Sequence, residues 1–207
     1  MKPFTNHSGI ALPLLTDNLN TDVIIPSREM KRVSKVRLAN GLFANIRYSD
    51  GNRKPDPEFL LNHPNYRAAS ILILGRNAGC GSSREHAVWA LADYGFKVVV
   101  AESFASIFYN NCVANGVLPI TLDRPSIEAI TEWVRMNPTS HHLSVNLEKC
   151  TLDTTDNSFD FVIAPLARRM LLNGLAPIDL TLEDKGLIDR FIADDMRRRQ
   201  WLYRISD

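Results

Sequence analysis

The middle of the chain alternates between short apolar runs and amphipathic stretches. Three runs are apolar almost throughout, as buried strands of a parallel sheet are: residues 70–74, 97–101 and 117–122. The segments between them, residues 84–95 and 103–116, have the character of helices that end at a glycine. Strands that alternate with helices predict an α/β fold, with a mainly parallel central sheet flanked by helices.

The segments on either side of this core carry weaker signals. Two short strands are predicted at residues 10–15 and 22–26, separated by a polar turn. Residues 48–65 are dense in Gly, Pro, Asn and Asp, which predicts a long surface loop. Residues 125–136 repeat apolar positions with the helical period and predict a further helix.

The last third of the chain changes character. Residues 143–165 alternate like an antiparallel hairpin around the turn at 154–158, and a short helix follows that ends at Gly174. We expect a final helix that Thr181 caps, with one apolar face formed by Leu187, Ile188, Phe191 and Ile192. The pattern therefore predicts a single domain over residues 1–207, with a C-terminal helical extension over about 181–207.

Composition narrows the partners that we expect. The 207 residues are 45% hydrophobic and 23% charged, with a formal net charge of +1, so no electrostatic feature favours nucleic acid or a membrane surface. No apolar run approaches the roughly 20 residues of a membrane helix. The three cysteines, Cys80, Cys112 and Cys150, are far apart and form no CxxC pair. We therefore expect a cytoplasmic protein without disulfides and without a metal site of its own.

The segment GCGSSREHA, residues 79–87, is the strongest candidate for chemistry. Ser82 and Glu85 fit the S-x-x-E capping box of a helix start. That pattern leaves the neighbouring residues unexplained: Gly79, Gly81, Ser83 and Arg84. Glycines let a ligand approach the main chain, and a helix N-terminus attracts anions. A cation such as Arg84 is unfavourable at that end of a helix unless it faces a bound carboxylate or phosphate.

Common phosphate and nucleophile motifs do not fit this segment. No lysine follows as the Walker pattern requires, and Arg84 stands where a dinucleotide fingerprint has its third glycine. The nucleophile elbow needs glycines on both sides of one serine in another register. Spacing alone therefore predicts an anion site, containing a serine, at a strand–loop–helix junction.

Residues 75–120, which contain this segment, closely resemble the small subunits of 3-isopropylmalate dehydratases. These subunits are the separate-chain form of the swivelling domain of aconitase-type hydro-lyases. The resemblance continues in NTDVIIP at residues 20–26 and in RRMLLNGLAPIDLTL at 168–182, so it spans nearly the whole chain. It implies an aconitase swivelling-domain-like β/β/α fold.

The resemblance also implies a heteromeric enzyme. A large partner subunit would hold a [4Fe–4S] cluster, and this chain would bind no cofactor and would supply the other wall of the site. The family eliminates water from a small hydroxy-diacid and adds it back, which interconverts 2-isopropylmalate and 3-isopropylmalate in leucine biosynthesis. The lack of a cysteine cluster in this chain agrees with that division of labour.

Two residues would carry the catalytic step by this resemblance. Ser82 matches the serine whose alkoxide takes and returns the carbon-bound proton, and N–H groups at the helix start would stabilise that alkoxide. Arg84 would hold a substrate carboxylate with its two-pronged guanidinium group. Beside them, Ser83 would add a hydrogen bond, and Gly81 belongs to the turn that lets substrate approach.

Further binding residues come from the N-terminal segment. Asp22 would orient polar groups of the site, although an Asx turn explains it equally well. Lys31 and Arg32 are candidates for binding the distal carboxylate of the substrate. Glu85 and His86 are assigned to capping and packing.

The sequence departs from the family pattern at three positions. Arg28 and Glu29 stand where less charged or aromatic residues are common, in the segment that the family uses for substrate recognition, and Ala176 replaces an acid. Two alternatives stay open: a related hydratase for another substituted malate (homocitrate, citramalate or a methylated malate), and a non-catalytic partner module that keeps the fold. Loss of Ser82 or Arg84 would favour the module, and both residues are present.

Overall fold

A seven-stranded mixed sheet forms the centre of the protein, for which a computed structural model describes residues 1–30, 36–49 and 53–203. The strands are β1 (Asn6–Leu14), β2 (Ala69–Leu74), β3 (Val98–Ala101), β4 (Leu118–Thr121), β5 (His142–Asn146), β6 (Thr151–Asp153) and β7 (Ser158–Asp160). They lie in the order β4-β3-β2-β1-β5-β6-β7. Strands β1 to β4 pair in parallel, and β5, β6 and β7 extend the sheet beyond β1 in antiparallel pairs. The predicted α/β class, with its parallel strands and antiparallel hairpin, is confirmed.

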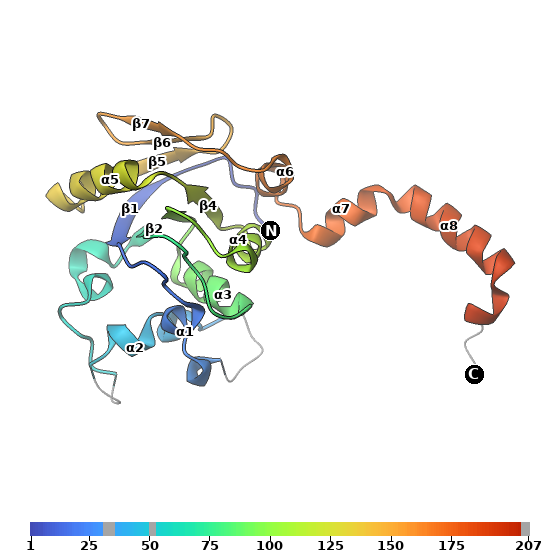
Figure 1. Ribbon diagram of the computed structural model, residues 1–207, viewed down its shortest axis with the longest axis horizontal. Helices are drawn as coiled ribbons and strands as arrows, with labels where there is room; N and C mark the ends of the chain where they lie inside the picture. Colours follow the sequence, from blue (N-terminus) through green and yellow to red (C-terminus); the bar gives the residue numbers. More distant parts are fainter. Residues whose placement is uncertain (31–35, 50–52, 204–207) are drawn as a thin grey trace.

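Both faces of this sheet are covered by helices: α1 (Thr21–Ile24), α2 (Ala44–Arg47), α3 (Glu85–Tyr94), α4 (Ser106–Ala114) and α5 (Arg124–Met136). Helix α6 (Pro165–Asn173) packs beside α4, and α7 (Pro177–Glu183) and α8 (Lys185–Arg198) follow it in the chain. The chain steps in one direction from β1 to β4, so right-handed connections place α1 to α4 on one face. The connection from β4 to β5 runs back past β1 and carries α5 across the other face (Figure 1).

The middle of the sheet is the most deeply buried part of the core. All of β3, and β2 except Ser70, are buried, as the continuous apolar runs predict. Helix α3 turns Ala87, Val88 and Leu91 toward the core, and α4 contributes Phe108. This packing fixes the positions at which β1 and β2 end.

The predicted strand at residues 22–26 is wrong, because this segment lies in the short helix α1 and the two extended residues after it, Ile25 and Pro26. Asn20 caps the helix: its side-chain oxygen accepts the N–H of Val23 at 2.9 Å. Ile24 and Ile25 are buried beside the sheet rather than within it. An apolar run of this length satisfies its burial in either conformation, and the cap at Asn20 selects the helix.

The predicted surface loop at residues 48–65 is only partly irregular. Its second half contains two 3₁₀ helices, η3 (Leu60–Asn62) and η4 (Pro64–Tyr66). Leu61 and Tyr66 are buried in the core. Two apolar anchors therefore fix a segment whose composition indicates only a loop.

The prediction of one C-terminal helix capped by Thr181 is also wrong. Two helices, α7 and α8, meet at Asp184, and Thr181 lies inside the first of them. The first helix begins at Pro177, because proline suits a first helical turn, and the N–H of Ala176 donates to the carboxylate of Asp179 at 2.6 Å. Both helices extend away from the sheet (Figure 1). Among the described residues, no helix combines the length and apolarity needed to cross a membrane.

Candidate active site

Two loops meet at the carboxyl ends of β1 and β2. These strands are parallel neighbours, so the chain leaves both at the same edge of the sheet, where α/β proteins bind ligands. The N–H of Thr21 donates to the carbonyl of Cys80 at 2.9 Å, and the N–H of Gly79 donates to that of Leu19 at 2.8 Å. The pairing of the strands therefore continues into the loops, and α1 lies beside the segment that precedes α3.

Two glycines shape the second loop, for different reasons. Gly79 has a φ of +73°, and a Cβ added there would lie 2.0 Å from the Cγ of Phe108. Gly81 has a φ of +99°, but the nearest atom to its Cβ would be 3.3 Å away, on Asn20. Gly79 thus permits close packing against α4, whereas Gly81 permits the turn that leads to Ser82.

Ser82 is held by Thr21 rather than by a helix cap. The hydroxyl oxygens of the two residues lie 2.9 Å apart, and the N–H of Ser82 donates to the same Thr21 oxygen at 3.2 Å. The prediction that Ser82 is the N-cap is therefore wrong, since α3 is preceded by Arg84 in that position, without a side-chain cap. Ser82 lies two residues before the N-cap position. The group beside the Ser82 hydroxyl is therefore the Thr21 hydroxyl, and not the N–H groups at the start of α3.

Glu85 and His86 serve packing at the start of α3. The carboxylate of Glu85 accepts a hydrogen bond from the side-chain nitrogen of Asn115 at 2.7 Å, instead of closing a capping box. Asn115 in turn accepts the indole N–H of Trp89 at 3.1 Å. The His86 ring packs against that indole with a centroid separation of 4.5 Å. These contacts fix the helix that follows the loop.

Arg84 and Asp22 form an ion pair across the two loops. A terminal guanidinium nitrogen of Arg84 contacts a carboxylate oxygen of Asp22, and the two side chains are 28% and 52% exposed. Asn20, not Asp22, supplies the cap of α1, so the Asp22 carboxylate is directed to Arg84. Gly81, Ser82 and Ser83 are exposed next to the pair. The arrangement presents a hydroxyl and a guanidinium group together, which suits carboxylate binding and proton transfer.

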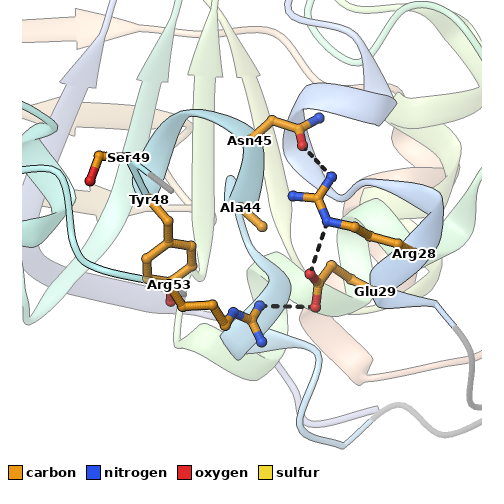
Figure 2. A pocket seen from close by; sticks show the side chains of 7 residues that line it. All are labelled: Arg28, Glu29, Ala44, Asn45, Tyr48, Ser49 and Arg53. Carbon is orange, nitrogen blue, oxygen red and sulfur yellow. Dashed lines mark hydrogen bonds and ion pairs between the residues drawn. The ribbon is translucent and has the colours of Figure 1, made fainter. Parts of the chain in front are cut away.

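A pocket of about 500 Å³ lies in the region that follows α1, between η1 (Ser27–Glu29) and α2. Figure 2 shows the Glu29 carboxylate between the guanidinium groups of Arg28 and Arg53. Arg28 also donates to the side-chain oxygen of Asn45 at 2.6 Å. The unusual charges at residues 28 and 29 therefore pair with each other and tie η1 to neighbouring segments. Lys31 and Arg32, the predicted ligands of the distal carboxylate, lie outside the described residues.

Thr21 is the site residue that the sequence analysis misses. Its side chain is 1% exposed and contacts Ser82 through both hydrogen bonds described above. The sequence does contain a signal for this helix: Asn20 is a residue type that favours the N-cap position, and its side chain accepts the N–H three residues later, that of Val23. Interpreting the segment as a strand hid the possibility that Thr21 points at the second loop.

The described part of the chain offers no ligand set for a metal cluster. Across those residues, no group of three His, Cys, Asp or Glu side chains comes together. Cys112 is fully buried, and this burial raises the pKa of its thiol, which disfavours the thiolate that a cluster needs. The Cys80 thiol donates to the carbonyl of Asn18 at 3.3 Å. A cluster ligated by these cysteines does not fit the geometry.

Known proteins that are similar to this chain include small subunits of 3-isopropylmalate dehydratases. The aconitase C-terminal domain family matches residues 1–125. The 3-isopropylmalate dehydratase small subunit of Cupriavidus necator is 48% identical over 205 residues, which cover 98% of this chain and 99% of that protein. The small subunit of Paracoccus denitrificans is 43% identical, covering 98% and 100%. A solved 3-isopropylmalate dehydratase structure from Methanocaldococcus jannaschii has 26% identity and a TM-score of 0.63, covering 89% and 98%.

Proposed function

Because the chain belongs to the family of 3-isopropylmalate dehydratase small subunits, we propose that it forms one wall of a hydro-lyase active site that a large subunit completes. The reaction interconverts 2-isopropylmalate and 3-isopropylmalate by loss and re-addition of water, a step of leucine biosynthesis. One observation carries the proposal for the site: Ser82 and the Asp22–Arg84 pair come together at the carboxyl ends of adjacent parallel strands.

In this proposal Ser82 takes the carbon-bound proton and returns it. A serine hydroxyl needs a stabilised anion for this task. The Thr21 oxygen accepts the N–H of Ser82, and it lies 2.9 Å from Ser82 Oγ and 3.4 Å from the Ser82 carbonyl oxygen. The Thr21 hydroxyl can therefore donate to Ser82 Oγ, the nearer of the two oxygens. An oxyanion donor of this kind contributes about 3 kcal/mol in enzymes. As such a donor, Thr21 stabilises the Ser82 alkoxide.

Arg84 binds a substrate carboxylate, and Asp22 orients it. The guanidinium group has five N–H donors in a planar fork, so the bond to Asp22 leaves a pair of donors for a bidentate contact. The ion pair also fixes the rotamer before substrate arrives, which reduces the entropy lost on binding. Ser83 and the main chain at Gly81 complete the contacts to the substrate.

The remaining parts of the site are proposed to come from the large subunit and from two further residues of this chain. We place the family's [4Fe–4S] cluster on the large subunit, because the described residues of this chain do not fit it. Lys31 and Arg32 are proposed to bind the distal carboxylate of the hydroxy-diacid. Both subunits would work in the cytoplasm, where the three free cysteines stay reduced.

The first experiment tests the substrate. The chain is co-purified anaerobically with its large subunit and assayed on 2-isopropylmalate, homocitrate, citramalate and methylated malates. We expect the highest kcat/KM for 2-isopropylmalate. A preference for another diacid would correct the substrate assignment and would point to Arg28 and Glu29. An intact, cluster-loaded complex that turned over none of them would support the non-catalytic module instead.

The second experiment tests the residues. Ser82→Ala in the complex should lower kcat about 10³-fold with a smaller effect on KM, as expected for loss of a general base. Arg84→Lys should raise KM and also lower kcat, because lysine keeps the charge but loses the bidentate geometry. Ser140→Ala, at an exposed serine outside the site, is the control and should change neither constant. A Ser82→Ala complex with most of its rate would show that the base lies elsewhere.

A further inference from the structure

The C-terminal arm, defined here as residues 177–203, is rich in exposed large apolar side chains. Among the described residues, fifteen large apolar side chains are exposed, and eight of them lie within 178–202. These eight are Ile178, Leu182, Leu187, Phe191, Ile192, Met196, Trp201 and Leu202. Figure 1 shows the arm extending away from the sheet, so its own chain does not cover these side chains. The other seven are scattered over the rest of the chain.

Helix α8 separates its apolar and charged residues. At 100° per residue, Leu187, Ile188, Phe191 and Ile192 share one face, and Ala193 lies on the opposite face. Lys185 pairs with Asp189 and Arg197 pairs with Asp194 within the helix. Because these charges neutralise each other, the apolar face remains the part of the helix that is available for a partner.

The end of the arm is folded back to continue this apolar surface. The Asp195 carboxylate accepts hydrogen bonds from Arg199 at 2.6 Å and from the Tyr203 hydroxyl at 2.8 Å. These bonds lower the pKa of Asp195 and hold the 3₁₀ helix η5 (Gln200–Leu202) beside α8. Trp201 and Leu202 are nevertheless 69% and 58% exposed. A network that orders the chain while leaving a tryptophan in water indicates a preformed binding surface.

The size of this surface matches a stable interface. A helix of α8's 14 residues is marginal by itself in water, and monomeric proteins rarely expose contiguous apolar areas of this kind. A standard interface buries about 800 Å² on each partner, and eight large apolar side chains at these exposures supply an area of that order. The exposed apolar area of the arm is therefore comparable with one side of a standard interface.

We propose that the arm docks into an apolar groove of the large subunit and is the main attachment between the two chains. The inference rests on the proposed function, since it needs that partner. The relatives that bear the name small subunit align over 98% of this chain, so the arm belongs to the length that they share. If two copies of this chain paired through their arms instead, the large subunit would meet only scattered apolar side chains.

A binding titration tests this proposal. The full-length chain and its variants are titrated into the anaerobically purified large subunit, and Kd is measured for each. The double variant Leu187→Glu/Phe191→Glu should raise Kd roughly 100-fold or more, as for residues at the centre of an interface. Ala193→Glu places the same charge on the opposite face of α8 and should leave Kd within about threefold. At saturating concentrations the double variant should regain the wild-type kcat, because the arm does not touch the site.

The outcomes separate the arm from the function. A double variant that is folded by circular dichroism and binds with the wild-type Kd would overturn the docking role of the arm. Loss of self-association in sedimentation, with an unchanged Kd for the large subunit, would also overturn it, in favour of a second copy as occupant. An arm-dependent Kd in a cluster-loaded complex without dehydratase activity would leave the docking role standing and refute the proposed function.

Discussion

At the scale of single residues, Thr21 is the least expected part of the site and the easiest to test. Thr21→Val keeps the shape of this buried side chain but removes the hydroxyl that contacts Ser82. We expect kcat to fall about 10²-fold, as for loss of one oxyanion donor, with little change in KM. Without the donor, the pKa of Ser82 rises, so the rising limb of the pH–rate profile should move to higher pH.

Thr21→Ser is the matched control for this prediction, because serine keeps the hydroxyl. In the complex, the serine variant should have the rate and the pH profile of the wild type. A valine variant with reduced stability but an unchanged pH profile would show that Thr21 only packs the loop.

His7 makes stability depend on pH far from the site. Its Nε2 lies 2.8 Å from the Ser70 hydroxyl, and burial, followed by the charge of Lys97, lowers the pKa of this histidine. The folded state therefore binds the proton less readily than the unfolded state, whose pKa is 6.5. The stability contribution is complete above pH 6.5 and is lost as the pH falls below it toward the folded pKa.

Urea unfolding at pH 7.5 and 5.5 measures this effect. The free energy of unfolding should drop more between these pH values in the wild-type chain than in His7→Gln, which cannot take up the proton. Equal drops in the two proteins would assign the pH dependence to other groups.

Single residues also show how far the sequence could lead. Ser82, Arg84 and Asp22 came from a motif, and the structure brings all three together. The contacts of these residues could not be predicted in the same way. Ser82 contacts Thr21 instead of closing a capping box, and Asn20, not Asp22, caps helix α1. Both differences depend on the meeting of two loops about 60 residues apart in the sequence, which local patterns do not encode.

At the scale of elements, long periodic segments were predictable and short ones were not. Residues 70–74 and 97–101 can satisfy their burial only as central strands, and helix α5 begins within one residue of its predicted start. Residues 22–26 are too short for periodicity to separate a strand from a helical turn. Thr181 resembled a cap, but Pro177 starts the helix four residues earlier.

Helix α5 contains a testable defect. Thr131 is 2% exposed, and within the described residues its hydroxyl has no hydrogen-bond partner. Thr131→Val replaces this hydroxyl with a methyl group of the same shape and should raise the free energy of unfolding by about 1 kcal/mol. Thr131→Ser keeps the hydroxyl and removes the methyl, so it should destabilise the chain. Urea unfolding of the three proteins decides the matter; a destabilised valine variant would mean that the hydroxyl has a partner.

At the scale of the whole molecule, the sheet and its site form one unit and the arm forms another. The sequence predicted the sheet because its strands are buried on both faces. It also predicted an apolar face on the last helix, which is ordinarily a sign of packing against the core. The structure leaves that face exposed instead, because α8 continues away from the sheet beyond α7. A sequence pattern shows that a helix has an apolar face that is stabilised by burial. It does not show whether that face packs against its own chain or against another molecule.

The independence of the arm leads to the last prediction, for the chain without its large subunit. Truncation after Asp184 removes α8 and η5 but keeps α7, whose Leu180 packs against the core. Because the side chains of α8 are largely exposed, the free energy of unfolding should stay within about 0.5 kcal/mol of the full chain, as for a surface change. Urea unfolding monitored by the fluorescence of Trp89 in α3 and Trp133 in α5 measures the body of the protein once Trp201, which the truncation removes, has been replaced by phenylalanine in the full chain. A loss of about 2 kcal/mol or more would mean that α8 packs against the body in solution. The arm would then not be the free docking surface that its exposure indicates.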